Sequence, residues 1–161
     1  MKLFTFPNPA NEIAARVVAG GVVVMGLLVL IPGWNWLLVA LAYGFVARVL
    51  NGPTFSPLGQ FVTRVLTPNL PFAAKHVPGP PKRFAQGIGA TLSLSACVAA
   101  FGFANWTVAI VLVALITLAA TLESVLGLCL GCTLFAMLMR AGVIPESVCE
   151  RCADIWATNH A

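Results

Sequence analysis

Charged side chains are what this 161-residue sequence has least of. Lys, Arg, Asp and Glu make up 9% of its residues, hydrophobic residues make up 60%, and the mean hydropathy is +0.95. Soluble domains carry about 25% charged residues, so this chain has too few charges to cover a surface exposed to water. No charge occurs between Arg16 and Arg48, and Glu123 is the only one between Arg83 and Arg140. This pattern is typical of a protein that crosses a membrane several times.

Several functional signatures are also missing. The sequence has no glycine-rich phosphate loop, no Ser-His-Asp set and no pair of histidines within an apolar segment that could hold a haem. Its net charge of +4 comes from basic residues spread along the flanks of apolar segments, which argues against nucleic-acid binding. Membrane lipids are the expected surroundings, and such a chain is compatible with assembly into an oligomer.

Four apolar segments are predicted to cross the membrane as helices, at residues 13–31, 35–50, 84–103 and 107–128. The first would be roughly 28 Å long, close to a hydrocarbon core of about 30 Å. Short turns follow the first and the third segment. The sequence therefore predicts an all-α polytopic membrane protein, with four transmembrane helices in two hairpins that form a single integral membrane domain over residues 1–161.

The long loop 51–83 is predicted to contain a helix that lies on the membrane surface. It holds seven of the eleven prolines and so cannot be a continuous transmembrane helix. Ser56 is a suitable N-cap, and Pro57 is suitable as the first helical residue. The apolar residues that follow at helical spacing are Leu58, Phe61, Val62, Val65 and Leu66.

Basic residues predict the orientation of the chain. All nine occur at the N-terminus, in loop 51–83 and its flanks, or after the fourth span, and the two short turns carry none. The positive-inside rule then places both termini, loop 51–83 and the segment 132–161 in the cytoplasm. The expected location is the inner membrane of a bacterium, with a short cytoplasmic helix in the C-terminal segment.

Two Cys-x-x-Cys pairs are the most specific feature of the sequence. Cys129 and Cys132 come directly after the fourth span, and Cys149 and Cys152 follow in the C-terminal segment. Their spacing falls in the range of a tetrathiolate metal site. We expect the helix to kink or break at Gly127 and Gly131, which flank the first pair. A short helix is expected to begin near this pair and to favour thiolate formation there.

The cytoplasmic location limits what these four cysteines can do. Thiols there are kept reduced, so static disulfides are rare. Three uses stay open: a dithiol that cycles between oxidised and reduced forms, a thiolate-bound zinc or iron ion, and a thiol that carries sulfur. The fifth cysteine, Cys97, is expected to be a small packing residue remote from the pairs.

Glu123 is the one acidic residue within a predicted span. An ionisable group at the centre of a membrane helix costs about 2.5–3.5 kcal/mol on insertion scales, and such groups are usually functional. Glu123 is therefore a candidate proton relay beside the cysteines; the alternative is a glutamate that is neutral or paired with arginine and fixes helix packing. Lys82 and Arg83, at the start of the third span, are expected to anchor to lipid headgroups.

Glycines within the spans are expected to allow close packing between helices. They are Gly20, Gly21, Gly26, Gly87 and Gly89.

Five motifs together resemble the bacterial membrane family known as domain of unknown function 4395 (DUF4395). They are FPNPANE at 6–12, SPLG at 56–59, PGPPKRFAQGIG at 78–89, LESVLGLCLGC at 122–132 and VCERC at 148–152. The resemblance implies a small bacterial inner-membrane protein whose relatives are often encoded near thioredoxin-like and sulfurtransferase proteins.

These observations predict a membrane thiol protein, either a thiol-disulfide oxidoreductase or a sulfur-transfer component. Cys129, Cys132, Cys149, Cys152 and Glu123 would carry its chemistry, with a soluble thioredoxin-like or sulfurtransferase partner. One alternative is a structural zinc or iron site at the four cysteines within a membrane scaffold. A second is a soft-metal transporter that passes an ion between thiols.

Overall fold

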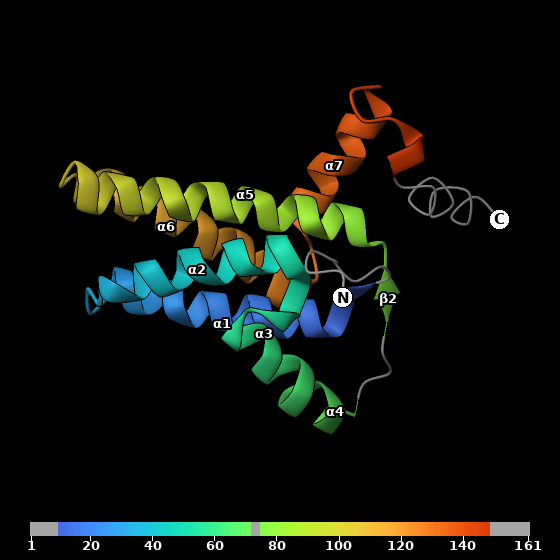
Figure 1. The fold of residues 1–161 in the computed structure, drawn as a ribbon, viewed down its shortest axis with the longest axis horizontal. Helices are drawn as coiled ribbons and strands as arrows, with labels where there is room; N and C mark the ends of the chain where they lie inside the picture. The colour runs from blue at the N-terminus through green and yellow to red at the C-terminus, as the bar shows by residue number, and fades with distance from the viewer. Residues whose placement is uncertain (1–9, 72–74, 149–161) are drawn as a thin grey trace.

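A computed structural model of the chain describes residues 10–71 and 75–148, and these are almost entirely helical (Figure 1). The long helices are α1 (Glu12–Leu30), α2 (Trp36–Asn51), α5 (Gly79–Cys97) and α6 (Trp106–Thr121), and a shorter one, α7 (Leu130–Arg140), follows them. Short helical segments after α2 are a 3-10 turn (Gly52–Thr54), α3 (Pro57–Phe61), a π-helical segment (Val62–Leu66) and α4 (Thr67–Asn69). Two further π-helical segments extend α5 (Val98–Gly102) and α6 (Leu122–Leu126), and a 3-10 turn lies at Glu146–Val148.

Four helical stretches are long and apolar enough to cross a membrane, as the composition predicts. They run over Glu12–Leu30, Trp36–Asn69, Gly79–Gly102 and Trp106–Leu126. The third begins five residues before the predicted 84. Prolines 80 and 81 lie in its first turn, where a missing N–H breaks no hydrogen bond. These two prolines therefore belong to the first turn of α5, whereas the sequence predicted that they lie in the loop before the helix.

Helices α1 and α5 begin side by side because two short strands join them. Strand β1 (Ala10–Asn11) pairs antiparallel with β2 (His76–Val77), so that Asn11 faces His76. The Asn11 side chain also caps α1, accepting hydrogen bonds from the backbone N–H groups of Ile13 and Ala14. Asn11 thus starts the first helix and also pairs with the strand that leads into α5.

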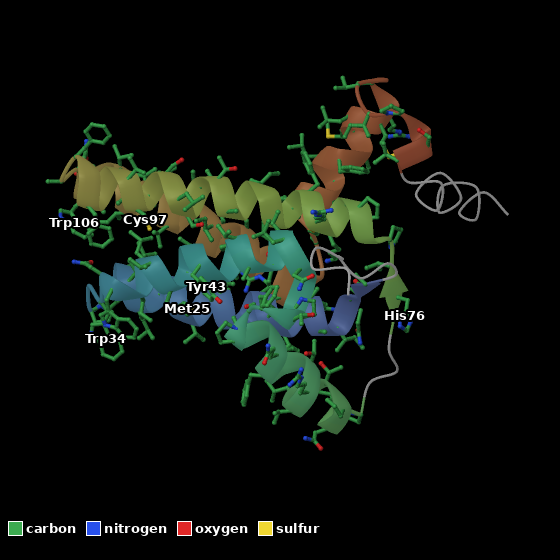
Figure 2. The ribbon with its side chains drawn as sticks, in the orientation of Figure 1. Met25, Trp34, Tyr43, His76, Cys97 and Trp106 are labelled. Carbon is green, nitrogen blue, oxygen red and sulfur yellow. The ribbon has the colours of Figure 1, made fainter. Side chains whose placement is uncertain are left out.

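The two short connections lie at the opposite end of the bundle. Trp34, between α1 and α2, and Trp106, at the start of α6, lie together at one end in Figure 2, and His76 lies at the other. Helix α2 packs mainly on α5, and α1 packs mainly on α6. The core near the tryptophan end is made of small and branched side chains such as Leu38, Ala96 and Val113.

The segment predicted to be an interfacial helix is helical but does not present one continuous stripe. Ser56 accepts a hydrogen bond from the Gly59 N–H, so it caps α3 as predicted. Val62 is buried against Ala14 and Val18 of α1. Phe61 and Val65, predicted on the same stripe, are about half exposed. The π-helical turn at Val62–Leu66 rotates successive side chains away from ideal α-helical spacing and so divides the stripe.

Four of the five predicted close-packing glycines meet a neighbour. A side chain at Gly26 would collide with Thr117 of α6, and one at Gly89 would collide with Phe45 of α2. Gly20 and Gly21 are also closely approached by other side chains. Gly87 is different: nothing lies within 4 Å of where its Cβ would be, so the prediction was wrong at that position.

Candidate thiol site

A left-handed glycine creates the break that positions the first cysteine pair. Gly127 has φ +69° and ends the π-helical segment Leu122–Leu126. This conformation is strained for other residues, and it turns the chain so that α7 starts three residues later. Figure 1 shows α7 leaving the bundle beside the start of α5. The predicted break is confirmed at Gly127, whereas Gly131 lies within α7 and causes no break.

Arg16 supports this break from α1. Its guanidinium donates hydrogen bonds to the backbone carbonyls of Ser124 and Val125, at 3.0–3.3 Å. A cation at a helix C-terminus compensates carbonyl groups that lack partners within the helix. Arg16 thus holds the end of the fourth span from the first helix.

Cys129 is the N-cap of α7. Its Sγ accepts a hydrogen bond from the backbone N–H of Cys132 at 3.4 Å, as a serine hydroxyl does at this position. Helix α7 thus begins at Leu130, within the pair, two residues before the predicted C-terminal segment at 132. Cys129 is buried and Cys132 is partly exposed, and both are free thiols.

Contacts with α5 fix α7 in place. Phe135 is buried, and its ring packs on Phe84 at a centroid distance of 5.5 Å. A Cβ at Gly131, between the two cysteines, would collide with Ala85. The absence of a side chain at Gly131 therefore brings the thiol pair close to the first turns of α5.

Glu123 forms an ion pair with Lys82. Lys82 Nζ lies 2.6 Å from Glu123 Oε1, and both side chains are largely buried, at 9% and 14% exposure. Lys82 was expected to anchor to lipid headgroups, and that interpretation is wrong: it points into the bundle toward the carboxylate. The expected lipid-facing role stays a prediction for Arg83, which is exposed and donates to the Val49 carbonyl.

The electrostatic environment makes the two thiols unequal. A hydrogen bond from the Cys132 side chain, helped by the charge of Lys82 and the Cys132 N–H, holds the pKa of Cys129 below its ordinary value. Burial and the charge of Glu123 oppose this effect. The same hydrogen bond, together with burial, raises the pKa of Cys132. Cys129 is therefore the more acidic thiol of the pair.

Arg48 is a second buried cation that the sequence analysis did not single out. It donates to Gln86 Oε1 at 2.9 Å and to Ser56 Oγ at 3.4 Å, and its guanidinium lies 4.6 Å from the centre of the Phe45 ring. Only 5% of Arg48 is exposed. Its position three residues from the end of an apolar helix suggested a flanking residue, and only the packing of α3 and α5 around α2 buries it.

A cavity of about 370 Å³ joins these groups. Most of its wall is apolar and comes from α1, α5, α6 and α7. Its polar wall consists of Arg48, Gln86, Glu123 and Cys129. The structure thus brings together two of the predicted site residues, Glu123 and Cys129, with two residues that the sequence analysis did not propose for the site.

The second predicted pair, Cys149 and Cys152, lies outside the described residues. Within residues 10–71 and 75–148, no three His, Cys, Asp or Glu side chains are grouped in a way that could hold a metal ion. Cys97 is far from the site: it lies toward the tryptophan end in Figure 2, and its thiol points at the Leu38 carbonyl, 3.6 Å away.

The sequence could predict that Glu123 has a cationic partner, but not that this partner is Lys82. A carboxylate within a span needs a compensating cation, and Lys82 is one of few that could reach it. The arginine partner that the sequence analysis weighed was the wrong residue type. The orientation of α5 about its own axis decides whether Lys82 or Arg83 faces Glu123. The local sequence does not predict that orientation.

Comparison with known proteins gave one match. No curated protein and no solved structure matched the chain. The family model described as "Domain of unknown function (DUF4395)" matches residues 10–140, which include Lys82, Glu123, Cys129 and Cys132. The VCERC motif at 148–152 lies beyond the matched region. Since the match covers most of the 161 residues, the chain belongs to the DUF4395 family.

Proposed function

We propose that this protein is a membrane thiol-disulfide exchange protein in which Cys129 is the nucleophile and Cys132 the resolving thiol. The observation that carries this proposal is the Cys129 sulfur at the N-terminus of α7, hydrogen-bonded by Cys132 and close to Lys82. Helix N-termini and nearby cations stabilise thiolates, and the thiolate is the attacking species in disulfide exchange.

The exchange reaction uses both thiols in order. The Cys129 thiolate attacks one sulfur of a partner disulfide, a mixed disulfide forms, and the other partner sulfur leaves as a thiolate. Cys132 then attacks Cys129, the mixed disulfide breaks, and a Cys129–Cys132 disulfide forms while the partner gains two electrons. Glu123, whose charge acts on both thiols, is the proposed acceptor of the Cys132 proton, which it passes to the partner thiolate.

The orientation proposed for the membrane puts this site at the cytoplasmic face. Arg16, Arg48, Lys82 and Arg83 lie in the helix ends next to β1 and β2, opposite the tryptophan end. The positive-inside rule would make that end cytoplasmic, with α1–α2 and α5–α6 as two membrane hairpins and α3 and α7 at the interface. A soluble thioredoxin-like or sulfurtransferase protein in the cytoplasm would then reach the thiols, and Cys149 and Cys152 would pass electrons or sulfur between the partner and Cys129.

A mixed-disulfide trap tests the proposal. We expect the Cys132→Ser variant of the full-length protein, in detergent, to accumulate a covalent complex with an oxidised thioredoxin-like protein, because the resolving thiol is missing. The Cys129→Ser variant should form no such complex, and Cys97→Ser should behave as the wild type. The measurement is non-reducing electrophoresis followed by mass spectrometry of the linked cysteines.

Two results would contradict the proposal. One is a covalent complex of equal yield in the Cys129→Ser variant. The other is a stoichiometric zinc or iron ion, found by elemental analysis, that keeps the thiols unreactive until it is chelated. The second result would favour the tetrathiolate metal site instead.

A further inference from the structure

The cavity beside Cys129 is built like a binding site for a small apolar molecule. Ligand sites of this kind usually measure about 300–1,000 Å³, with apolar walls and a few polar groups that orient the ligand, and the volume of about 370 Å³ falls within this range. A thiol-disulfide role explains why Cys129 is reactive. It does not explain why the reactive thiol faces an apolar cavity.

The cavity opens toward the surroundings of the bundle and not toward its core. Four leucines on its wall are exposed to between 43% and 58%: Leu115, Leu118, Leu130 and Leu134. The first two belong to α6, which is apolar enough to cross a membrane, and the other two belong to α7. A molecule dissolved in the lipid could therefore enter between α6 and α7 without crossing water.

The polar wall is suited to carbonyl oxygens. Arg48 is a permanent cation with several N–H donors, and Gln86 carries an amide. Each lines the cavity from a different helix, α2 and α5. Arg48 Nε donates a hydrogen bond to Gln86 Oε1, which holds both side chains in place. The N–H groups that this bond does not use therefore belong to two fixed side chains of a wall that is otherwise mostly apolar.

We propose that this cavity binds a membrane quinone, which accepts two electrons from the Cys129–Cys132 dithiol. A quinone has a flat, apolar ring with carbonyl acceptors and is soluble in lipid, and the cavity supplies an apolar slot, N–H donors, access from the lipid and a thiol on its wall. The inference rests on the proposed thiol function, since it names the electron acceptor for the reverse direction of that exchange, in which a soluble dithiol reduces the Cys129–Cys132 disulfide.

These reactants alone account for all the electrons and protons that are transferred. A soluble dithiol partner, acting in the reverse of the exchange described above, reduces the Cys129–Cys132 disulfide. The two cysteines then lose two electrons and form one S–S bond. The quinone gains these two electrons and two protons and becomes a quinol. One proton comes from the Cys132 thiol, and water supplies the other, replacing the one that Cys129 released on ionising.

Reduced full-length protein mixed anaerobically with a short-chain quinone provides the test. The quinone should be fully ring-substituted, so that it cannot form a thioether by displacing a ring hydrogen. We expect two thiols to be lost for each quinol formed. Thiol titration measures the first quantity, and quinone absorbance measures the second. Ala119→Phe, which fills the cavity from α6, should slow this reaction about tenfold or more, which corresponds to 1.4 kcal/mol of lost binding.

A matched variant and a second oxidant separate the possible failures. Ala114→Phe lies on the exposed face of the same helix and outside the cavity, so it should leave the rate unchanged. Oxidation of both variants by a soluble disulfide should equal that of the wild type. If the soluble disulfide oxidises the thiols but the quinone does not, or if Ala119→Phe has no effect on the quinone reaction, the quinone site is wrong and the thiol function stands. If neither oxidant reacts, both proposals are wrong.

Discussion

The difference between Cys129 and Cys132 arises from groups that are not adjacent in the sequence. Cys132 lowers the pKa of Cys129 by donating a hydrogen bond, and Lys82 adds a positive charge from α5. Glu123 acts against both effects but is itself neutralised by its ion pair with Lys82. The balance of these interactions leaves one thiol more acidic than its neighbour three residues away.

Removing Lys82 should slow the reaction of Cys129 at neutral pH. In Lys82→Met the pKa of Cys129 should rise for two reasons. The positive charge that stabilises the thiolate is lost, and the negative charge of Glu123 is no longer neutralised. Less thiolate is then present at any pH below the pKa, and the alkylation rate at pH 7 should fall severalfold. At high pH, where both proteins carry the thiolate, the two rates should converge.

This prediction is checked by measuring alkylation of Cys129 with a small reagent between about pH 5 and pH 10, with peptide mass spectrometry to assign the site. Arg83→Met is the matched control, because it removes the neighbouring cation, which contacts the Val49 carbonyl and not Glu123. A pH profile of Lys82→Met that coincides with that of the wild type would show that Lys82 does not act on Cys129.

At the scale of helices, close approach between α1 and α6 sets the width of the bundle around the site. Gly26 lies against Thr117, and Arg16, ten residues earlier on α1, holds the end of the π-helical segment Leu122–Leu126. Glu123 lies within that segment. A π-helical turn changes the direction of side chains relative to an α-helix, and such turns are frequent at functional sites.

Enlarging Gly26 should separate these helices. We expect Gly26→Leu to destabilise the protein by about 1–3 kcal/mol, the usual cost of overpacking a close contact. Gly87→Leu is the control, since nothing lies within 4 Å of a Cβ at that position, and replacing glycine within a helix is favourable by up to about 1 kcal/mol.

Unfolding in detergent micelles, followed by circular dichroism, measures both variants. If Gly26→Leu and Gly87→Leu are equally stable, the close packing of α1 on α6 is wrong. If the packing is as described, the midpoint of Gly26→Leu should fall while that of Gly87→Leu stays the same or rises.

At the scale of the whole molecule, the two ends of the bundle differ in chemistry. One end carries the short turns with Trp34 and Trp106, which suit a membrane interface. The other carries the paired strands, the break at Gly127 and the thiol site. In the proposed orientation, a site at this end would face both a soluble partner protein and a molecule in the lipid.

The proposed orientation predicts which end meets the cytoplasm. In a variant whose native cysteines are replaced, a single cysteine introduced at Gly33 should react with a membrane-impermeant thiol reagent added to intact bacterial spheroplasts. A single cysteine introduced at Asn69 should react only after the membrane is permeabilised. The opposite pattern would reverse the orientation and place the thiol site outside the cytoplasm.

The sequence alone determined the class of the protein and several local features. Scarcity of charge predicted four apolar helical stretches because composition acts over whole segments. Gly127 predicted the helix break, and the short helix near Cys129 followed from the same stretch, because backbone conformation depends on neighbouring residues. Ser56 predicted the start of α3 for the same reason.

Only the tertiary structure decided which side chains share the site. Lys82 and Glu123 are 41 residues apart, and their ion pair depends on the rotation of α5 against the end of the fourth span. Arg48 is buried only because α3 and α5 pack around it, and the cavity forms where α5 meets α1, α6 and α7. Hydrophobic periodicity shows that a helix has an apolar face. It does not show which other helix that face will meet, because many pairings bury similar apolar area.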